Sequence, residues 1–220
     1  AVEGVVTSED FTPKWRAIAL DVLLILLLPS IILSYNWLVF PEYIEFVALN
    51  PHDVSVITVY GHLLGHVSPA HLWKNVGSLV VYGLSLYGLA LWNIEFRWFR
   101  GSFLSILVVV PLVTASIMWL LAPLFGGGGT LIAGASDVGF AFGGAISVIY
   151  LEYVRRQLRQ TGAQSSIVGL GLFVAVLLGA LLWSSLRLEL SLVSHVAHLA
   201  GFLSGFSIAS IGHRLLTNVN

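Results

Sequence analysis

Three stretches of the chain combine serine, histidine and asparagine in a pattern that fits nucleophilic catalysis. Ser136 directly follows a glycine-rich stretch, and His198 lies near the start of the last apolar run. In an earlier run, His71 and Asn75 are four residues apart. A serine hydroxyl becomes nucleophilic beside a general base, and the oxyanion it creates needs hydrogen-bond donors. Together these residue types indicate acyl transfer by a serine nucleophile.

The same residues are predicted to lie near helix starts. Ser68 is a suitable N-cap and Pro69 a suitable first helical residue, so His71 and Asn75 fall one turn apart on one face. Ser136 falls at a helix N-terminus, where backbone N–H groups lack intrahelical partners. The histidine of the last run lies about one turn inside its helix. We therefore expect all three sites to share one depth.

Glycines follow the serine and the histidine at the same helical intervals, at positions Gly139 and Gly143, and Gly201 and Gly205. Stripes of small residues let two helices in a membrane approach closely. We therefore expect these two helices to touch. That contact would bring Ser136 and His198 within hydrogen-bonding reach, which is the first geometric requirement of a nucleophile and its base.

The composition identifies the solvent of these helices. Hydrophobic residues make up 57% of the chain and charged residues only 10%, against about a quarter in soluble domains. Because this number of charges cannot cover a water-exposed surface, most of the surface must face a lipid bilayer. The net charge of -1 also lacks the basic footprint of a nucleic-acid binder. We predict an integral membrane protein with no nucleic-acid partner.

A membrane-spanning helix needs about 20 mostly apolar residues. The sequence contains about six such runs, at 17–40, 69–92, 102–125, 135–154, 166–186 and 195–215. We predict an all-α fold made of a short tail, 1–16, and one six-helix transmembrane domain, 17–216.

The basic residues predict the orientation. Eight of the ten lie on one side of the predicted spans: Lys14, Arg16, Arg97, Arg100, Arg155, Arg156, Arg159 and Arg214. Positive residues collect on the cytoplasmic side, so both termini are predicted to be cytoplasmic and the odd-numbered connections outside. A six-helix core without large appendages suits a prokaryotic membrane protein, so we expect this protein in a prokaryotic plasma membrane.

At these residues the chain resembles the rhomboid family of intramembrane serine proteases. The resemblance covers most of the chain and rests on three motifs in order. The first motif is similar to the second-helix pattern of a histidine followed by HxxxN, and consists of His62, His66, His71 and Asn75. The second is similar to GxS in the fourth helix, and consists of Gly134, Ala135 and Ser136. The third is similar to AHxxGxxxG in the sixth helix, and consists of Ala197, His198, Gly201 and Gly205.

The resemblance implies a six-helix rhomboid-like core and a role for each matching residue. Ser136 would be the nucleophile and His198 the general base of a dyad without a carboxylate, with His71 and Asn75 helping to form the oxyanion hole. The substrate would be a transmembrane segment of another protein, cut near the outer face at a small residue. Neither cofactor nor metal is implied. Because the base must be uncharged, activity should fall below pH of about 6.5.

The chain departs from the family pattern directly after the serine. Most members have glycine there, whereas this chain has Asp137. A carboxylate in the first turn is favoured by the helix dipole, but one that faced the oxyanion hole would repel the developing charge. An alternative function is therefore a catalytically inactive rhomboid-like protein that binds transmembrane segments without cutting them.

Two further readings have less support. His62 with His66 and His195 with His198 have helical spacings that fit a metal ion, but the HExxH of a zinc protease is absent. A transporter would be expected to show internal symmetry and paired broken helices, which the sequence lacks. We therefore predict no metal site.

Overall fold

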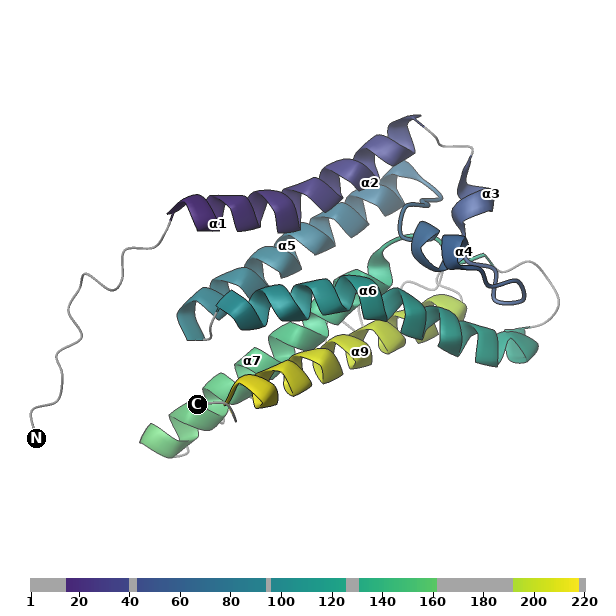
Figure 1. Cartoon of the computed structure of the whole chain (residues 1–220). Coiled ribbons are helices and arrows are strands. Elements are labelled where there is room, and N and C mark those ends of the chain that lie inside the picture. Colours follow the sequence, from purple (N-terminus) through teal and green to yellow (C-terminus); the bar gives the residue numbers. More distant parts are fainter. Residues whose placement is uncertain (1–14, 40–42, 94–95, 126–130, 162–191, 218–220) are drawn as a thin grey trace, which may run out of the picture.

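The computed structural model describes residues 15–39, 43–93, 96–125, 131–161 and 192–217. They form a bundle of long helices with two short helices at one end (Figure 1). No strand occurs among these residues, which agrees with the predicted all-α class. The predicted span 166–186 lies outside the described residues, so the count of six spans stays a prediction.

The first predicted span is one helix with a wide turn inside it. It comprises α1 (Trp15–Asp21), the π-helical segment η2 (Val22–Leu27) and α2 (Leu28–Val39). Pro29 follows the wide segment by two residues. A proline ring crowds the carbonyl four residues earlier, and a π-type turn moves that carbonyl outward. The wide turn therefore lets the chain continue as a helix through Pro29.

Four more long helices coincide with predicted spans: α5 (Pro69–Asn93), α6 (Phe96–Leu121), α7 (Ser136–Thr161) and α9 (Leu192–Thr217). A 3₁₀ turn, η4 (Ala122–Phe125), extends α6. By length and apolar composition, two stretches of the described chain are suited to crossing a membrane, namely Trp98–Leu124 and Leu192–Leu215.

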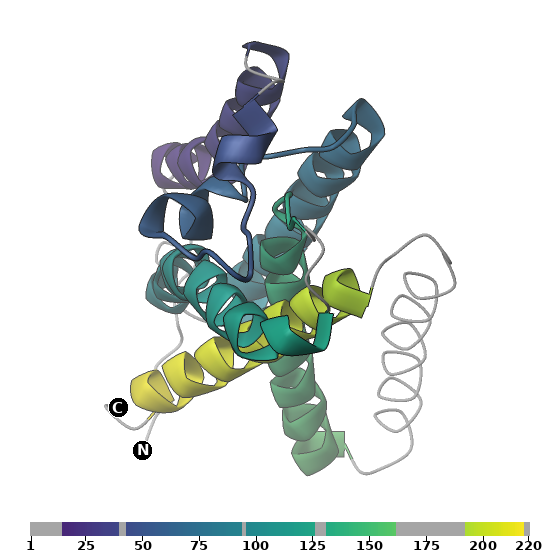
Figure 2. The ribbon, with the colours of Figure 1, turned by 90° about the vertical axis from the view of Figure 1, so that its right-hand side faces the viewer.

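The long helices pack around one apolar core. Leu86, Phe99, Ile106 and Phe142 are fully or almost fully buried between α5, α6 and α7. Phe103 of α6 stacks on Phe142 of α7 with ring centroids 5.0 Å apart. The two views show α9 crossing α7, with α6 packed against both (Figures 1 and 2). This arrangement fixes the start of α7 against the start of α9.

The predicted outer connection 41–68 folds over that end of the bundle. It contains α3 (Ile44–Val47) and α4 (Val56–Gly61), and Ser55 begins α4 through a capping box with Thr58. Backbone bonds of 2.9 and 3.0 Å join Leu49 to Ile132, in the chain just before α7. This connection and the segment that leads into α7 are therefore joined by backbone hydrogen bonds.

Polar and apolar residues are distributed as a lipid solvent requires. Large apolar side chains on the outside are widely exposed, with Leu38 at 80% and Leu120 at 70%. By contrast, His62 and Asp137 are only 0% and 2% exposed. In a bilayer, polar groups that face the bundle interior indicate a functional site.

Candidate active site

The helix α7 begins at Ser136, as the sequence predicts. The backbone carbonyl of Ala135 accepts the first intrahelical bond, from the Gly139 N–H at 3.1 Å. Two residues before the serine, Gly134 has a φ of +112°, which side-chain-bearing residues rarely adopt. This turn presents the Ser136 side chain, which is half-buried, at the start of the helix.

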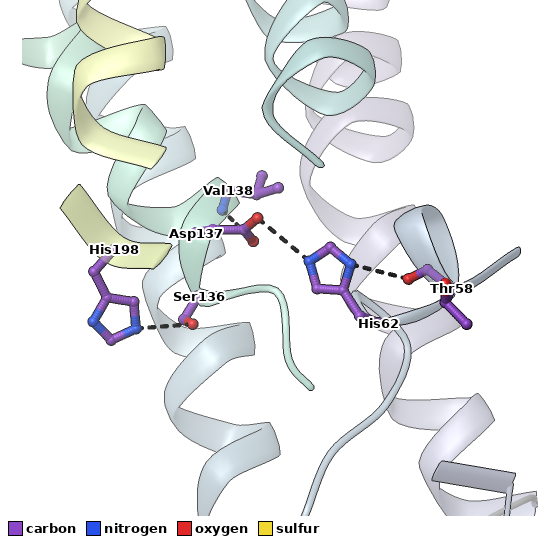
Figure 3. Close-up of polar contacts among 6 residues, drawn as sticks. All are labelled: Thr58, His62, Ser136, Asp137, Val138 and His198. Atoms are coloured by element: carbon purple, nitrogen blue, oxygen red, sulfur yellow. Dashed lines mark hydrogen bonds and ion pairs between the residues drawn. The ribbon is translucent and has the colours of Figure 1, made fainter. Parts of the chain in front are cut away.

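Ser136 and His198 meet as predicted. The Ser136 Oγ lies 3.0 Å from the His198 Nε2, so the hydroxyl can donate to an unprotonated ring nitrogen (Figure 3). The ring of Phe140 stacks on the His198 ring, with centroids 4.2 Å apart and planes 14° apart. Phe140 lies one turn after the serine, so the helix that carries the nucleophile also orients the histidine ring.

His71 and Asn75 lie one turn apart near the start of α5, which begins at Pro69 as predicted. Ser68 caps this helix by accepting the His71 N–H at 3.2 Å. The Asn75 amide donates to His71 Nε2 at 3.3 Å, so the His71 proton resides on Nδ1. Among the described side chains, that buried Nδ1 has no hydrogen-bond partner.

Gly134 links this donor pair to the serine turn. A Cβ added to Gly134 would lie 2.6 Å from both the Asn75 Nδ2 and the His71 Cε1. The backbone just before Ser136 therefore packs directly on the His71 and Asn75 side chains, and only glycine allows this approach.

Asp137 follows the serine but its carboxylate turns to the other side of the helix start. Its Oδ1 accepts the Val138 N–H at 2.8 Å, and its Oδ2 lies 3.4 Å from the His62 Nε2 (Figure 3). The carboxylate thus binds His62 while Ser136 binds His198. This geometry favours the stabilising interpretation of Asp137 over a carboxylate directed at an oxyanion.

Two buried histidines of the connection that carries α3 and α4 have pKa values shifted in opposite directions. Burial alone would lower the pKa of His62, but the hydrogen bond and charge of Asp137, with carbonyls of Val59 and Thr58, raise it above 6.5. Burial lowers the pKa of His66 to about 4, despite its bond to the Leu64 carbonyl. The surroundings therefore favour the protonated form of His62 and the neutral form of His66.

The glycine stripes bring α7 and α9 together, with one correction. Gly201 and Gly205 lie against the backbone carbonyls of Asp137 and Ala141, so neither has room for a Cβ. The glycine of α7 that lies against the α9 backbone is Gly144, which meets the Phe202 carbonyl.

The two predicted α7 glycines do not lie against the α9 backbone. A Cβ added to Gly139 would lie 3.5 Å from the Ser78 Cβ of α5. A Cβ added to Gly143 would have one neighbour, the Phe202 ring of α9, at 4.0 Å. The prediction that these two glycines make the contact with α9 therefore fails for Gly139, whereas Gly143 lies beside α9 only through the Phe202 ring. The backbone contact with α9 is made one residue later, at Gly144.

The sequence interpretation also missed two contacts of the site. Phe140 was available as a signal, because it lies four residues after Ser136 and on the same helical face. His62 was recognised as part of a motif, but its contact with Asp137 joins positions 75 residues apart. Helical spacing cannot reveal such a contact. Among the described residues, no group of three potential metal-ligating His, Asp or Glu side chains is assembled.

Comparison with protein families gives a match for this chain. The family model described as "Rhomboid domain" matches residues 53–215, which is most of the chain and includes every residue of the site. The chain belongs to the rhomboid family. It is therefore a membrane protein of an intramembrane protease family. No curated protein and no solved structure matches this rhomboid chain.

Proposed function

We propose that this rhomboid protein is an active intramembrane serine endopeptidase, with Ser136 as nucleophile and His198 as general base. The observation that carries the proposal is the distance of 3.0 Å between the Ser136 Oγ and the His198 Nε2 at a half-buried position. Peptide hydrolysis requires such a pair within hydrogen-bond reach and accessible to a substrate carbonyl.

The reaction follows from the two side chains. The His198 Nε2 takes the hydroxyl proton while the Ser136 Oγ attacks the peptide carbonyl. The imidazolium then returns the proton to the leaving amine, and water hydrolyses the acyl-enzyme by the same route. Stacking on Phe140 holds the imidazole plane during both transfers, because the ring centroids are only 4.2 Å apart.

The oxyanion would form beside the N-terminus of α7. The Val138 N–H is already bonded to Asp137, which leaves the Ser136 and Asp137 N–H groups at this helix start for an anion. His71 and Asn75 add side-chain donors from α5. Each such donor typically contributes a factor of about 10² to 10³ to the rate.

The proposed substrate is a transmembrane segment of another protein, cut near the outer face at a residue with a small side chain. This proposal is supported by the rhomboid family match and by the position of Ser136, next to the connection that carries α3 and α4. The charge pattern predicts that this connection is outside. A segment must unwind to present its peptide bond, because a helical backbone keeps its carbonyls bonded. The chemistry uses no cofactor or metal.

A serine-directed fluorophosphonate probe tests the activity without knowledge of the natural substrate. Purified protein in detergent should be labelled at Ser136, and both Ser136→Ala and His198→Ala should abolish labelling. Asp137→Gly serves as a comparison. If the parent is not labelled and Asp137→Gly is, the native chain is instead an inactive, segment-binding member of the family.

We also propose that both termini are cytoplasmic and that the α3–α4 connection is outside. The chain has no cysteine, so single cysteines report topology directly. In intact bacterial cells producing the protein, His52→Cys should react with a membrane-impermeant maleimide, and Arg156→Cys only after permeabilisation. The reverse pattern would contradict this orientation.

A further inference from the structure

His62 makes contact with the chain on both sides of the nucleophile. Its backbone carbonyl accepts the Gly134 N–H at 2.7 Å, and its ring Nε2 lies 3.4 Å from the Asp137 carboxylate. Gly134 and Asp137 are the residues two before and one after Ser136. One residue of the outer connection therefore holds the whole turn that carries the serine.

The two ring contacts of His62 favour its protonated form. Its Nδ1 lies 3.3 Å from the Thr58 carbonyl oxygen, which only accepts hydrogen bonds. Its Nε2 faces the Asp137 carboxylate, which also only accepts. Both ring nitrogens must therefore carry hydrogen for both bonds to exist. The geometry fits an imidazolium that is buried against a buried carboxylate.

The burial of His62 and Asp137 strengthens the attraction between them. His62 and Asp137 are 0% and 2% exposed, so water screens their attraction little. The groups that face the His62 ring are the Asp137 carboxylate of α7 and the carbonyls of Thr58 and Val59 in α4. The other carboxylates among the described residues of this connection, Glu45 and Asp53, are exposed.

We propose that His62, in its charged form, is a positioning residue for Ser136, acting through Asp137 and the Gly134 backbone. This inference rests on the proposed function. The residue that departs from the family pattern, Asp137, is then half of a clamp that fixes the serine turn against His71 and Asn75. His62 does not touch the reacting atoms.

The clamp predicts a loss of activity at alkaline pH. The pKa of His62 is raised by Asp137, so the ion pair is complete below the ordinary value of 6.5 and is lost as pH rises through the raised value. Since His198 must be neutral, the rate of probe labelling should be bell-shaped in pH. His198 would set the acid side and His62 the alkaline side.

The test measures fluorophosphonate labelling rates from pH 5 to 10 on the full chain in detergent. Asp137→Asn and His62→Gln should each lower the rate near pH 7 by about 10- to 100-fold, the usual effect of misplacing a reacting group. Asp137→Asn should also shift the alkaline side to lower pH, and His62→Gln should remove it. The double variant should be no slower than the slower single variant.

The control is His52→Gln, which changes an exposed histidine in the same connection and should leave rate and profile as in the parent. Folded variants that keep the parental rate and alkaline side would overturn the inference. So would rate losses that multiply in the double variant. A parent that is never labelled would instead overturn the proposed function, before any clamp variant is made.

A second measurement avoids substitution of the pair, in case His62→Gln does not fold. In the Ser136→Ala protein, amide hydrogen exchange of residues 134–139 is followed with pH and corrected for intrinsic exchange. Protection of this turn should fall as pH rises through the alkaline side of the labelling profile. Protection that does not change with pH would overturn the inference.

Discussion

Gly134 is the residue at which the backbone and side-chain requirements of the site coincide. Its φ of +112° and the lack of space beside Asn75 and His71 both exclude a side chain. Gly134→Ala should lower kcat on a transmembrane substrate by about 100-fold or more, because it displaces both the serine turn and the oxyanion donors.

Gly77→Ala is the matched control for that substitution, since Gly77 is a helical glycine of α5 with open space around its Cβ position. It should keep the parental kcat and gain a few tenths to about 1 kcal/mol of stability. Equal kcat for Gly134→Ala and the parent would contradict the packing described for the turn.

His66 should make the folded protein sensitive to acid. Burial lowers its pKa to about 4, so the folded state resists a proton that the unfolded chain binds near 6.5. Stability from this residue is therefore complete above pH 6.5 and is lost as pH falls toward 4. His62 acts in the opposite direction, because its pKa is raised.

The difference between the parent and His66→Gln isolates this contribution. The thermal unfolding midpoint in detergent is measured between pH 7.5 and 4.5. The midpoint of the parent should fall more steeply with acid than that of the variant. Parallel curves would show that His66 is protonated equally in the folded and unfolded states.

At the scale of elements, the contact of α7 with α9 depends on Gly144 rather than on its neighbour. A Cβ at Gly144 would meet the Phe202 backbone carbonyl, whereas one at Gly143 would have only a ring atom at 4.0 Å. Gly144→Ala should therefore push the helices apart and destabilise the fold by about 1–3 kcal/mol, the typical cost of overpacking.

The expected functional result distinguishes the two neighbouring glycines. Separation of the helices would lengthen the 3.0 Å contact of Ser136 with His198, so Gly144→Ala should also slow labelling by the serine probe. Gly143→Ala should keep both the parental labelling rate and the unfolding midpoint. The idea fails if the two variants behave alike.

The elements themselves could largely be predicted, because their signals are local. Apolar runs of the right length, Ser68 with Pro69, and the glycine-rich approach to Ser136 define the starts of α5 and α7. The contact face of α7 could not be predicted to the residue, because it depends on the crossing angle with α9. For the same reason the contact of Asp137 with His62 was missed, since it joins elements that are distant in sequence.

At the scale of the whole molecule, the serine site and the buried ion pair lie at opposite ends of the helix bundle. The site lies where α7 and α9 begin, near Ala115 and Met118 of α6, which pack beside Val193 and Ala197. The opposite end of α6 carries Arg100. Its guanidinium forms two bonds with the buried Asp21 of α1, at 3.0 and 2.8 Å.

The sequence interpretation missed this ion pair, although Asp21 is an acidic residue inside an apolar span. Such a residue is costly in a membrane unless it has a partner. Tyr87 of α5 also donates to Asp21, at 3.5 Å. Three helices, α1, α5 and α6, are therefore joined at one carboxylate, far along α6 from the serine.

Because the two ends are separate, the ion pair should support the fold without affecting the chemistry. Arg100→Gln removes the charge partner of a buried carboxylate and should destabilise the protein by about 1–3 kcal/mol. Arg155→Gln is the matched control, since the Arg155 pair with Glu152 is 3.9 Å long and largely exposed, and such pairs contribute little.

The unfolding midpoint and the serine labelling rate, measured on the same samples well below that midpoint, separate fold from chemistry. Arg100→Gln should lower the midpoint and leave the labelling rate of the folded protein unchanged, whereas Arg155→Gln should change neither. A slower rate in folded Arg100→Gln would mean that α1 is coupled to the serine across the bundle. In that case the two ends could no longer be treated as independent.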